Sequence, residues 1–67
     1  MITNEIGTNA GKIWNLLNEQ GDHSIKELKK KLKLTERDIY MSVGWLTREA
    51  KIFHFDNDGE WMVCLKE

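Results

Sequence analysis

The sequence predicts a small α+β domain in which three helices are followed by a C-terminal β-hairpin. Apolar residues recur at helical spacing in three successive segments. Two of these segments begin with a hydroxyl side chain that a carboxylate follows three residues later, which is a helix-capping pattern. Aromatic residues then lie on both sides of Asp58-Gly59, a pair that favours a tight hairpin turn. The segment His23-Ser24 is compatible with one further short strand.

Length and composition indicate one soluble domain that spans residues 1–67. The chain is 40% hydrophobic and contains no proline, which is typical of a globular protein rather than a disordered one. Its one cysteine, Cys64, excludes an internal disulfide and favours a reducing compartment. Because we find neither a charged and apolar leader nor an apolar run near 18 residues, we expect a cytoplasmic protein without a membrane partner.

The first helix is predicted from about Glu5 to Gln20. Its apolar residues follow one another at spacings of four, three and four, which places them on one face. These residues are Ile6, Ala10, Ile13 and Leu17. Gly21 follows where a left-handed residue commonly ends a helix.

The next two helices are predicted at Ile25–Leu32 and at Glu36–Ala50, with Ser24 and Thr35 as their N-caps. Lys33-Leu34 forms the turn between them. The buried stripe of the second helix is Ile25, Leu28 and Leu32, and that of the third is Ile39, Val43, Leu46 and Ala50. On a helical wheel Lys26, Lys30 and Lys33 share a different, solvent-facing side of the second helix.

The hairpin admits two registers. A two-residue Asp58-Gly59 turn pairs Phe53 with Cys64, whereas a three-residue Asn57-Asp58-Gly59 loop pairs Phe53 with Val63. The three-residue loop gathers the larger apolar residues on one face, namely Phe53, Phe55, Trp61, Val63 and Leu65. Because register decides which face is buried, we expect the three-residue loop.

The segment from Leu34 to Ile52, followed by a short aromatic hairpin, resembles the winged helix-turn-helix superfamily. More narrowly, the chain resembles a small prokaryotic family of stand-alone winged-helix domains of unassigned function. The core of this resemblance is Gly44-Trp45-Leu46 together with Lys51-Ile52. The resemblance implies the fold, and by analogy a DNA-binding role related to transcription regulation.

The resemblance also implies where DNA contacts would fall. In winged-helix DNA binders the third helix enters the major groove, while the preceding helix and the hairpin (the wing) touch phosphates. The positions that would read bases are Glu36, Arg37, Tyr40 and Met41, and those that would contact phosphates are Lys26, Lys30, Lys33, Thr35 and Arg48. Arg37 is the side chain there that can make a bidentate contact to guanine.

The charge distribution supports this role only in part. Residues 22–51 carry eight Lys/Arg against five Asp/Glu, a surplus of three, whereas residues 52–67 carry one Lys against four acids, a deficit of three. Asp56, Asp58 and Glu60 would repel phosphate at the wing tip. We therefore expect a monomer to bind duplex DNA weakly, and a solvated helix face accounts for the lysines slightly better than a nucleic-acid footprint does.

Trp45 and Met41 lie away from the buried stripe of the third helix. Trp45 either closes over the hairpin, onto His54 or Met62, or belongs to an exposed aromatic patch that anchors a protein partner. The second hypothesis for function is accordingly a protein-interaction or dimerisation module that uses Met41 and Trp45. We expect no catalytic activity, metal or cofactor, because no spacing of the two His and one Cys suggests a triad or a metal site.

Overall fold

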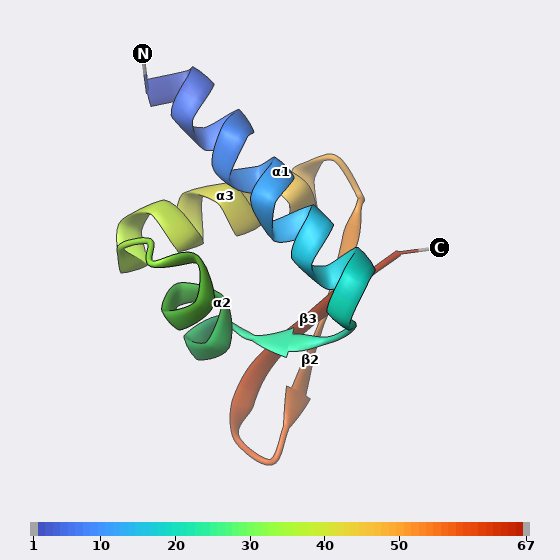
Figure 1. Cartoon of the computed structure of the whole chain (residues 1–67). Coiled ribbons are helices and arrows are strands. Elements are labelled where there is room, and N and C mark those ends of the chain that lie inside the picture. Colours follow the sequence, from blue (N-terminus) through green and yellow to red (C-terminus); the bar gives the residue numbers. More distant parts are fainter. Residues whose placement is uncertain (1, 67) are drawn as a thin grey trace.

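The computed structural model describes residues 2–66, with side chains from Glu5 onward. It contains three helices and three strands (Figure 1). In chain order these are α1 (Ile2–Gln20), β1 (His23–Ser24), α2 (Ile25–Leu32), α3 (Glu36–Arg48), β2 (Ile52–Asn57) and β3 (Glu60–Leu65). The predicted α+β architecture, the short strand at His23-Ser24 and the bounds of α2 are confirmed, while α1 begins before the predicted Glu5.

Both predicted N-caps are present. Ser24 Oγ accepts from the Glu27 N–H at 3.1 Å, and the Ser24 N–H donates to Glu27 Oε1 at 2.9 Å, which completes a capping box. At α3, Thr35 Oγ1 accepts from the Asp38 N–H at 3.2 Å. These caps satisfy backbone donors that the first helical turns leave without partners.

The end of α3 differs from the prediction. The helix stops at Arg48, and Ala50, predicted for the core face, is exposed in the left-handed conformation with φ 56°. The Lys51 N–H donates to the Leu46 carbonyl at 2.9 Å, and the Ala50 N–H to the Thr47 carbonyl at 3.0 Å. This pair of bonds is a Schellman motif, which ends the helix although no glycine is present there.

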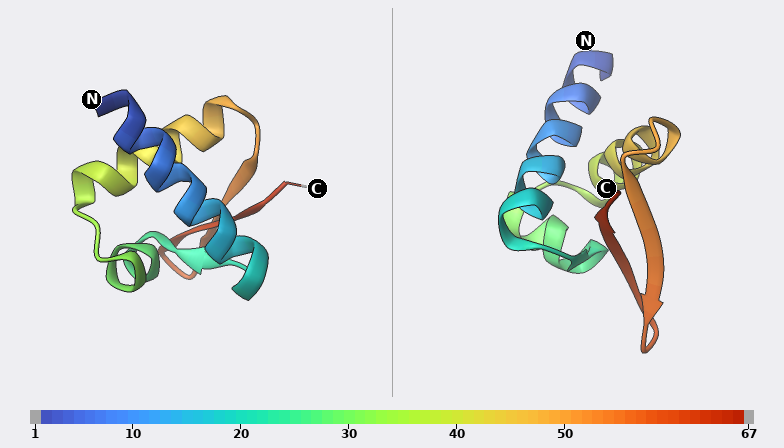
Figure 2. Two further views of the ribbon diagram at one scale, coloured as in Figure 1. Left: turned by 45° about the horizontal axis from the view of Figure 1, so that its top comes forward. Right: turned by 90° about the vertical axis from the view of Figure 1, so that its right-hand side faces the viewer.

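The three helices cover one face of an antiparallel sheet with strand order β1-β3-β2 (Figure 2). The core lies between them, and α1 makes its main contact with α3. Its buried apolar residues come from the three helices and from β2 and β3: Ala10, Ile13, Leu17, Ile25, Leu28, Ile39, Val43, Leu46, Ile52 and Val63. Leu34, in the turn between α2 and α3, packs against this core.

The predicted register of the hairpin is wrong by one residue. Phe53 pairs with Cys64 and Phe55 with Met62, around a two-residue Asp58-Gly59 turn. Both turn residues have positive φ, 56° and 88°, as a type I′ turn requires, and this turn chemistry outweighs the aromatic pattern. Ile52 and Val63 therefore face the core.

The corrected register places Phe53 and Phe55 on the uncovered face of the sheet. Their side chains are 52% and 40% exposed, respectively. The Lys66 ammonium lies over the Phe53 ring, 5.6 Å from its centroid. The sheet thus presents aromatic side chains to solvent on the side opposite the helices.

Candidate nucleic-acid interface

The candidate interface begins with the basic stripe, which we define as Lys26, Lys30 and Lys33. Ile25 and Leu28 anchor the opposite side of α2 in the core, so all three lysines are exposed. Among the described residues, none of the ion pairs or side-chain hydrogen bonds involves a lysine of this stripe. Each ammonium group is therefore available to an anion.

The other two lysines of α2 have partners within the protein. Lys29 Nζ lies 3.2 Å from Glu36 Oε1 and links α2 to the first turn of α3. Lys31 Nζ donates to Gln20 Oε1 at 3.0 Å and to His23 Nε2 at 2.9 Å. Because Nε2 accepts, the Nδ1 of the buried His23 donates to the Gly21 carbonyl at 2.7 Å. These two lysines thus have partners within the protein, whereas the basic stripe faces solvent.

The first turn of α3 follows the basic stripe along the chain. Thr35 uses an oxygen lone pair for the cap, so its hydroxyl hydrogen can still donate to a phosphate. Arg37 lies 3.4 Å from Asp38 Oδ1, and two-thirds of its side chain is exposed. This exposed contact is weak, because water competes for both groups, and the guanidinium can turn toward a ligand.

Tyr40 is joined to the wing. Its ring stacks on that of Trp61, with centroids 5.7 Å apart and an interplanar angle of 13°. Both side chains remain about half exposed, at 48% and 46%. The Tyr40 ring, at a predicted base-reading position, thus already has a stacking partner within the protein.

A hydrogen-bond chain holds Trp61 in place. The indole N–H donates to His54 Nδ1 at 2.8 Å, which leaves His54 Nε2 to donate to Thr47 Oγ1 at 2.6 Å. The Thr47 hydroxyl in turn donates to the Val43 carbonyl at 2.7 Å. This chain links β3 through β2 to α3. Sequence reasoning missed it because the link depends on the hairpin register.

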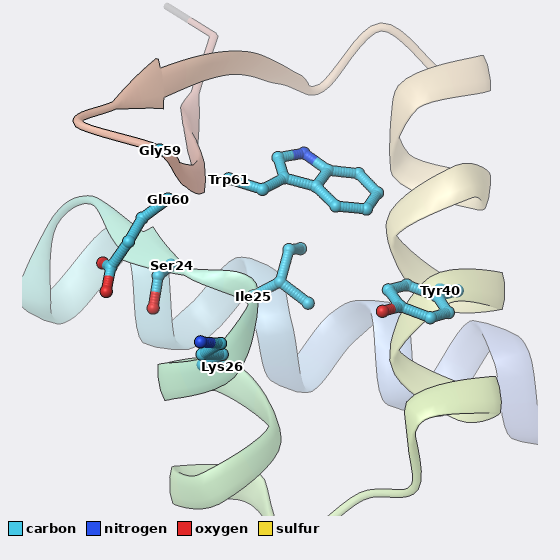
Figure 3. Close-up of a pocket in the computed structure, with 7 residues that line it drawn as sticks. All are labelled: Ser24, Ile25, Lys26, Tyr40, Gly59, Glu60 and Trp61. Atoms are coloured by element: carbon cyan, nitrogen blue, oxygen red, sulfur yellow. The ribbon is translucent and has the colours of Figure 1, made fainter.

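A pocket of about 220 Å³ lies where α2, α3 and the wing meet (Figure 3). Lys26 and Ser24 line one side, Tyr40 and Trp61 the other, and Glu60 closes the wing side. Figure 3 shows the Lys26 and Tyr40 side chains among those that line this pocket. The structure thus brings together two of the predicted nucleic-acid contacts, Lys26 and Tyr40, and adds Trp61 to them.

The wing tip is acidic, as the sequence predicts. We call Asp56, Asp58 and Glu60 the acidic tip; all three are exposed. Asp56 Oδ2 accepts from the Gly59 N–H at 3.3 Å and supports the turn. The remaining predicted contact residues are exposed Arg48 at the end of α3 and half-buried Met41 in its middle.

Trp45 does not close over the hairpin, so that interpretation is wrong. It lines a groove of about 280 Å³ between α1 and α3 together with Trp14, above Gly7 and Gly11. Trp45 is 38% exposed and Trp14 36%. We call this surface the tryptophan groove. Met41, predicted as its companion, does not line it.

Within the described residues, no helix is long and apolar enough to cross a membrane. In the same part of the chain, His, Cys, Asp and Glu side chains nowhere gather in a group of three that could hold a metal ion. His54 and Cys64, placed on one face by the predicted register, lie on opposite faces of the sheet.

Three helices, a tight turn before the third and a C-terminal hairpin define a winged helix-turn-helix protein. The family model described as "Winged helix-turn-helix domain (DUF2582)" matches residues 1–65, and the chain belongs to this family. The resemblance found in the sequence is therefore confirmed.

Two similar proteins extend this assignment. The uncharacterized protein MJ1608 of Methanocaldococcus jannaschii is 40% identical over 65 residues, which cover 92% of this chain and 91% of that protein. The solution NMR structure of protein BT2368 from Bacteroides thetaiotaomicron superimposes with a TM-score of 0.85 at 37% identity. That match covers 97% of this chain and 79% of the other. The fold is shared over nearly the whole chain.

Proposed function

We propose that the domain binds duplex DNA through α2 and the N-terminal half of α3, in a role related to transcription. The observation that carries the proposal is the basic stripe, whose three ammonium groups are exposed and free of ion pairs within residues 5–66. Cations on the helix before α3 are suited to phosphates, and Arg37 at the start of α3 is suited to a base edge.

The number of cations sets the expected affinity. The basic stripe, Arg37 and Arg48 provide five positive side chains, whereas strong DNA binding typically uses six to ten phosphate contacts. The acidic tip faces phosphate unfavourably, so the wing adds no compensating attraction. We therefore expect dissociation constants of about 10⁻⁴ to 10⁻⁶ M at physiological salt, the range of non-specific binding.

The test is a titration with mixed-sequence duplex DNA at two salt concentrations, followed by backbone amide shifts. We expect shifts at Arg37, Met41 and the basic stripe, and a triple Lys→Gln variant of the stripe should lower the salt slope by about 2.7. Lys12→Gln, on the exposed side of α1, is the matched control and should leave the slope unchanged. Unmoved amides on α2 and α3 at low salt would refute the proposal.

A second candidate function rests on the tryptophan groove. Two indoles, 36% and 38% exposed, line the groove with Gly7 and Gly11, which lie four residues apart on α1 and carry no side chain to obstruct a partner. Glu49 and Lys51 at its edge supply both charge signs. These features suit an amphipathic helix of another protein, with the tryptophans as anchors.

Affinity-tagged protein expressed in the source cells tests this candidate. A stoichiometric partner should be retained by the wild type and by Trp61→Ala, and lost by Trp45→Ala at unchanged melting temperature. A partner that Trp45→Ala retains would place the contact elsewhere, and the absence of any stoichiometric partner would argue against the candidate.

A further inference from the structure

Strand β2 lies at an edge of the sheet, next to β3 on one side only. Its residues from Phe53 to Asn57 are exposed, and the chain contains no proline to block pairing. Figure 2 shows this strand running along the outside of the fold. An exposed edge of this kind is a template for a further strand.

The hairpin register determines which backbone groups are free. The Lys66 N–H donates to the Lys51 carbonyl at 2.9 Å, and a two-residue turn makes its flanking pair a hydrogen-bonded one. Odd-numbered residues of β2 therefore bond to β3, and the backbone groups of Ile52, His54 and Asp56 point away from it. Among the described residues, none of the backbone bonds outside the helices and strand pairs uses these groups.

We propose that two copies of this chain pair antiparallel along β2, with His54 next to its own counterpart on the two-fold axis. The two three-stranded sheets then form one continuous sheet. The proposal concerns the protein alone and does not depend on DNA binding.

This register is self-complementary at the backbone. A two-fold axis perpendicular to the sheet keeps the covered faces of both copies on the same side. Even-numbered residues of one β2 strand therefore pair with even-numbered residues of the other, and odd-numbered with odd-numbered. Ile52 then pairs with Asp56 of the second copy, and His54 with His54. Both members of each pair present free backbone groups, so all three pairs can form hydrogen bonds.

The side chains agree with the same register. Phe53 comes opposite Phe55 of the second copy, twice by symmetry, on the uncovered face of the sheet. These are non-hydrogen-bonded pairs, in which the Cα atoms come closest and aromatic side chains interact well. The two phenylalanines are exposed in the single chain, so pairing removes apolar surface from water.

Charge complementarity favours a second copy over an unrelated strand. The base of the hairpin carries Lys51 and Lys66, whereas the other end is the acidic tip. Antiparallel pairing places Lys51 opposite Asn57 of the second copy, between Asp56 and Asp58. A parallel arrangement would instead bring like charges together at both ends.

Sedimentation and amide exchange test the proposal directly. At millimolar concentration we expect about twice the 7.9 kDa chain mass, with reversible dissociation on dilution. In the dimer the amides of Ile52, His54 and Asp56 should be protected, and on dilution they should exchange quickly while Phe53 and Phe55 stay protected. A monomer at all concentrations, with rapid exchange at His54, would overturn the proposal.

Paired substitutions test the register. F53K/F55K places lysine opposite lysine twice and should weaken the dimer at least about tenfold, whereas F53K/F55E places lysine opposite glutamate and should restore it. Both positions are exposed, so both variants should fold, as circular dichroism can verify. Trp45→Ala is the control and should leave the mass unchanged. A dimer lost in Trp45→Ala, or kept by F53K/F55K, would place the interface elsewhere.

Discussion

Lys33→Gly should change stability and DNA binding in opposite directions. Lys33 ends α2 in the left-handed conformation, with φ 54° and ψ 41°, and its N–H donates to the Lys29 carbonyl. A side chain in this conformation costs about 1 kcal/mol or more, and glycine avoids that cost. Glycine also has more conformational freedom in the unfolded chain, and this entropy offsets part of the stabilisation.

The net effect should be a stabilisation of about 0.5–1 kcal/mol, which in a domain of this size raises the melting temperature by about 2–8 °C. The same change removes one cation from the basic stripe. On the proposed DNA contact, the slope of log affinity against log salt should fall by about 0.9. Thermal unfolding by circular dichroism and a DNA titration at several salt concentrations measure the two effects.

Lys30→Gly is the matched control. It removes the same charge from the same stripe, but position 30 lies inside α2, where glycine costs about 1 kcal/mol relative to a good helix former. The two variants should therefore weaken DNA binding alike and move the melting temperature in opposite directions. A lower melting temperature for Lys33→Gly would refute the conformational argument, and an unchanged salt slope in both variants would refute the phosphate contact.

Three further outcomes follow from single side chains. The Ser24 N–H donates to the Glu27 carboxylate and lowers the pKa of Glu27. The stabilisation by Glu27 should therefore be fully present above its unfolded-state pKa and lost as pH falls through its folded-state pKa. In urea unfolding, the loss of stability caused by Glu27→Gln should accordingly shrink in acid. Ser42 Oγ is buried without a hydrogen-bond partner among the described residues, so Ser42→Ala should stabilise the fold by about 1 kcal/mol, and a destabilised variant would reveal a missing partner. A Cβ on Gly44 meets no atom within 4 Å, so Gly44→Ala should add about 0.5–1 kcal/mol of stability in thermal melts, and a lower melting temperature would contradict this.

The helices could be predicted because their signals are local. The bounds of α2 follow from Ser24, Glu27 and the apolar spacing of its eight residues, all within one segment. The end of α3 was overestimated because Ala50 is a strong helix former, and nothing in the sequence marks it as left-handed. That conformation belongs to the Schellman motif, in which the Ala50 and Lys51 N–H groups donate to the Thr47 and Leu46 carbonyls.

The hairpin register could not be predicted from the apolar pattern alone. The predicted register placed the most apolar side chains on one face by joining Phe53 and Phe55 to Trp61. The Asp58-Gly59 turn instead specified the register with a two-residue loop. The core has room for the smaller Ile52 and Val63, which are 4% and 0% exposed. The turn chemistry therefore decided which face of the hairpin is buried.

Some features of the candidate site could be predicted from local sequence, whereas others depend on the hairpin register. The shared side of Lys26 and Lys30 was predicted because helical spacing determines which side of α2 they occupy, whereas Lys33 follows the helix as its left-handed cap. The stacking of Tyr40 on Trp61 and the chain from Trp61 to Thr47 could not be predicted, since both require the correct register. Contacts within one helix follow from spacing, whereas contacts between α3 and the wing follow only from the assembled fold.

The uneven distribution of charge along the chain limits which side of the folded domain can face DNA. Lys26 and Glu60 line the same pocket, so one end of the basic stripe lies near the acidic tip. Lys33 and Arg37 are instead at the α2–α3 turn, away from this pocket. A phosphate backbone is attracted to the turn and repelled at the wing, because the two fields have opposite signs. On the proposed DNA contact, the duplex therefore lies against the α2–α3 turn, and the acidic tip faces away from it, available to the lysines of a second copy.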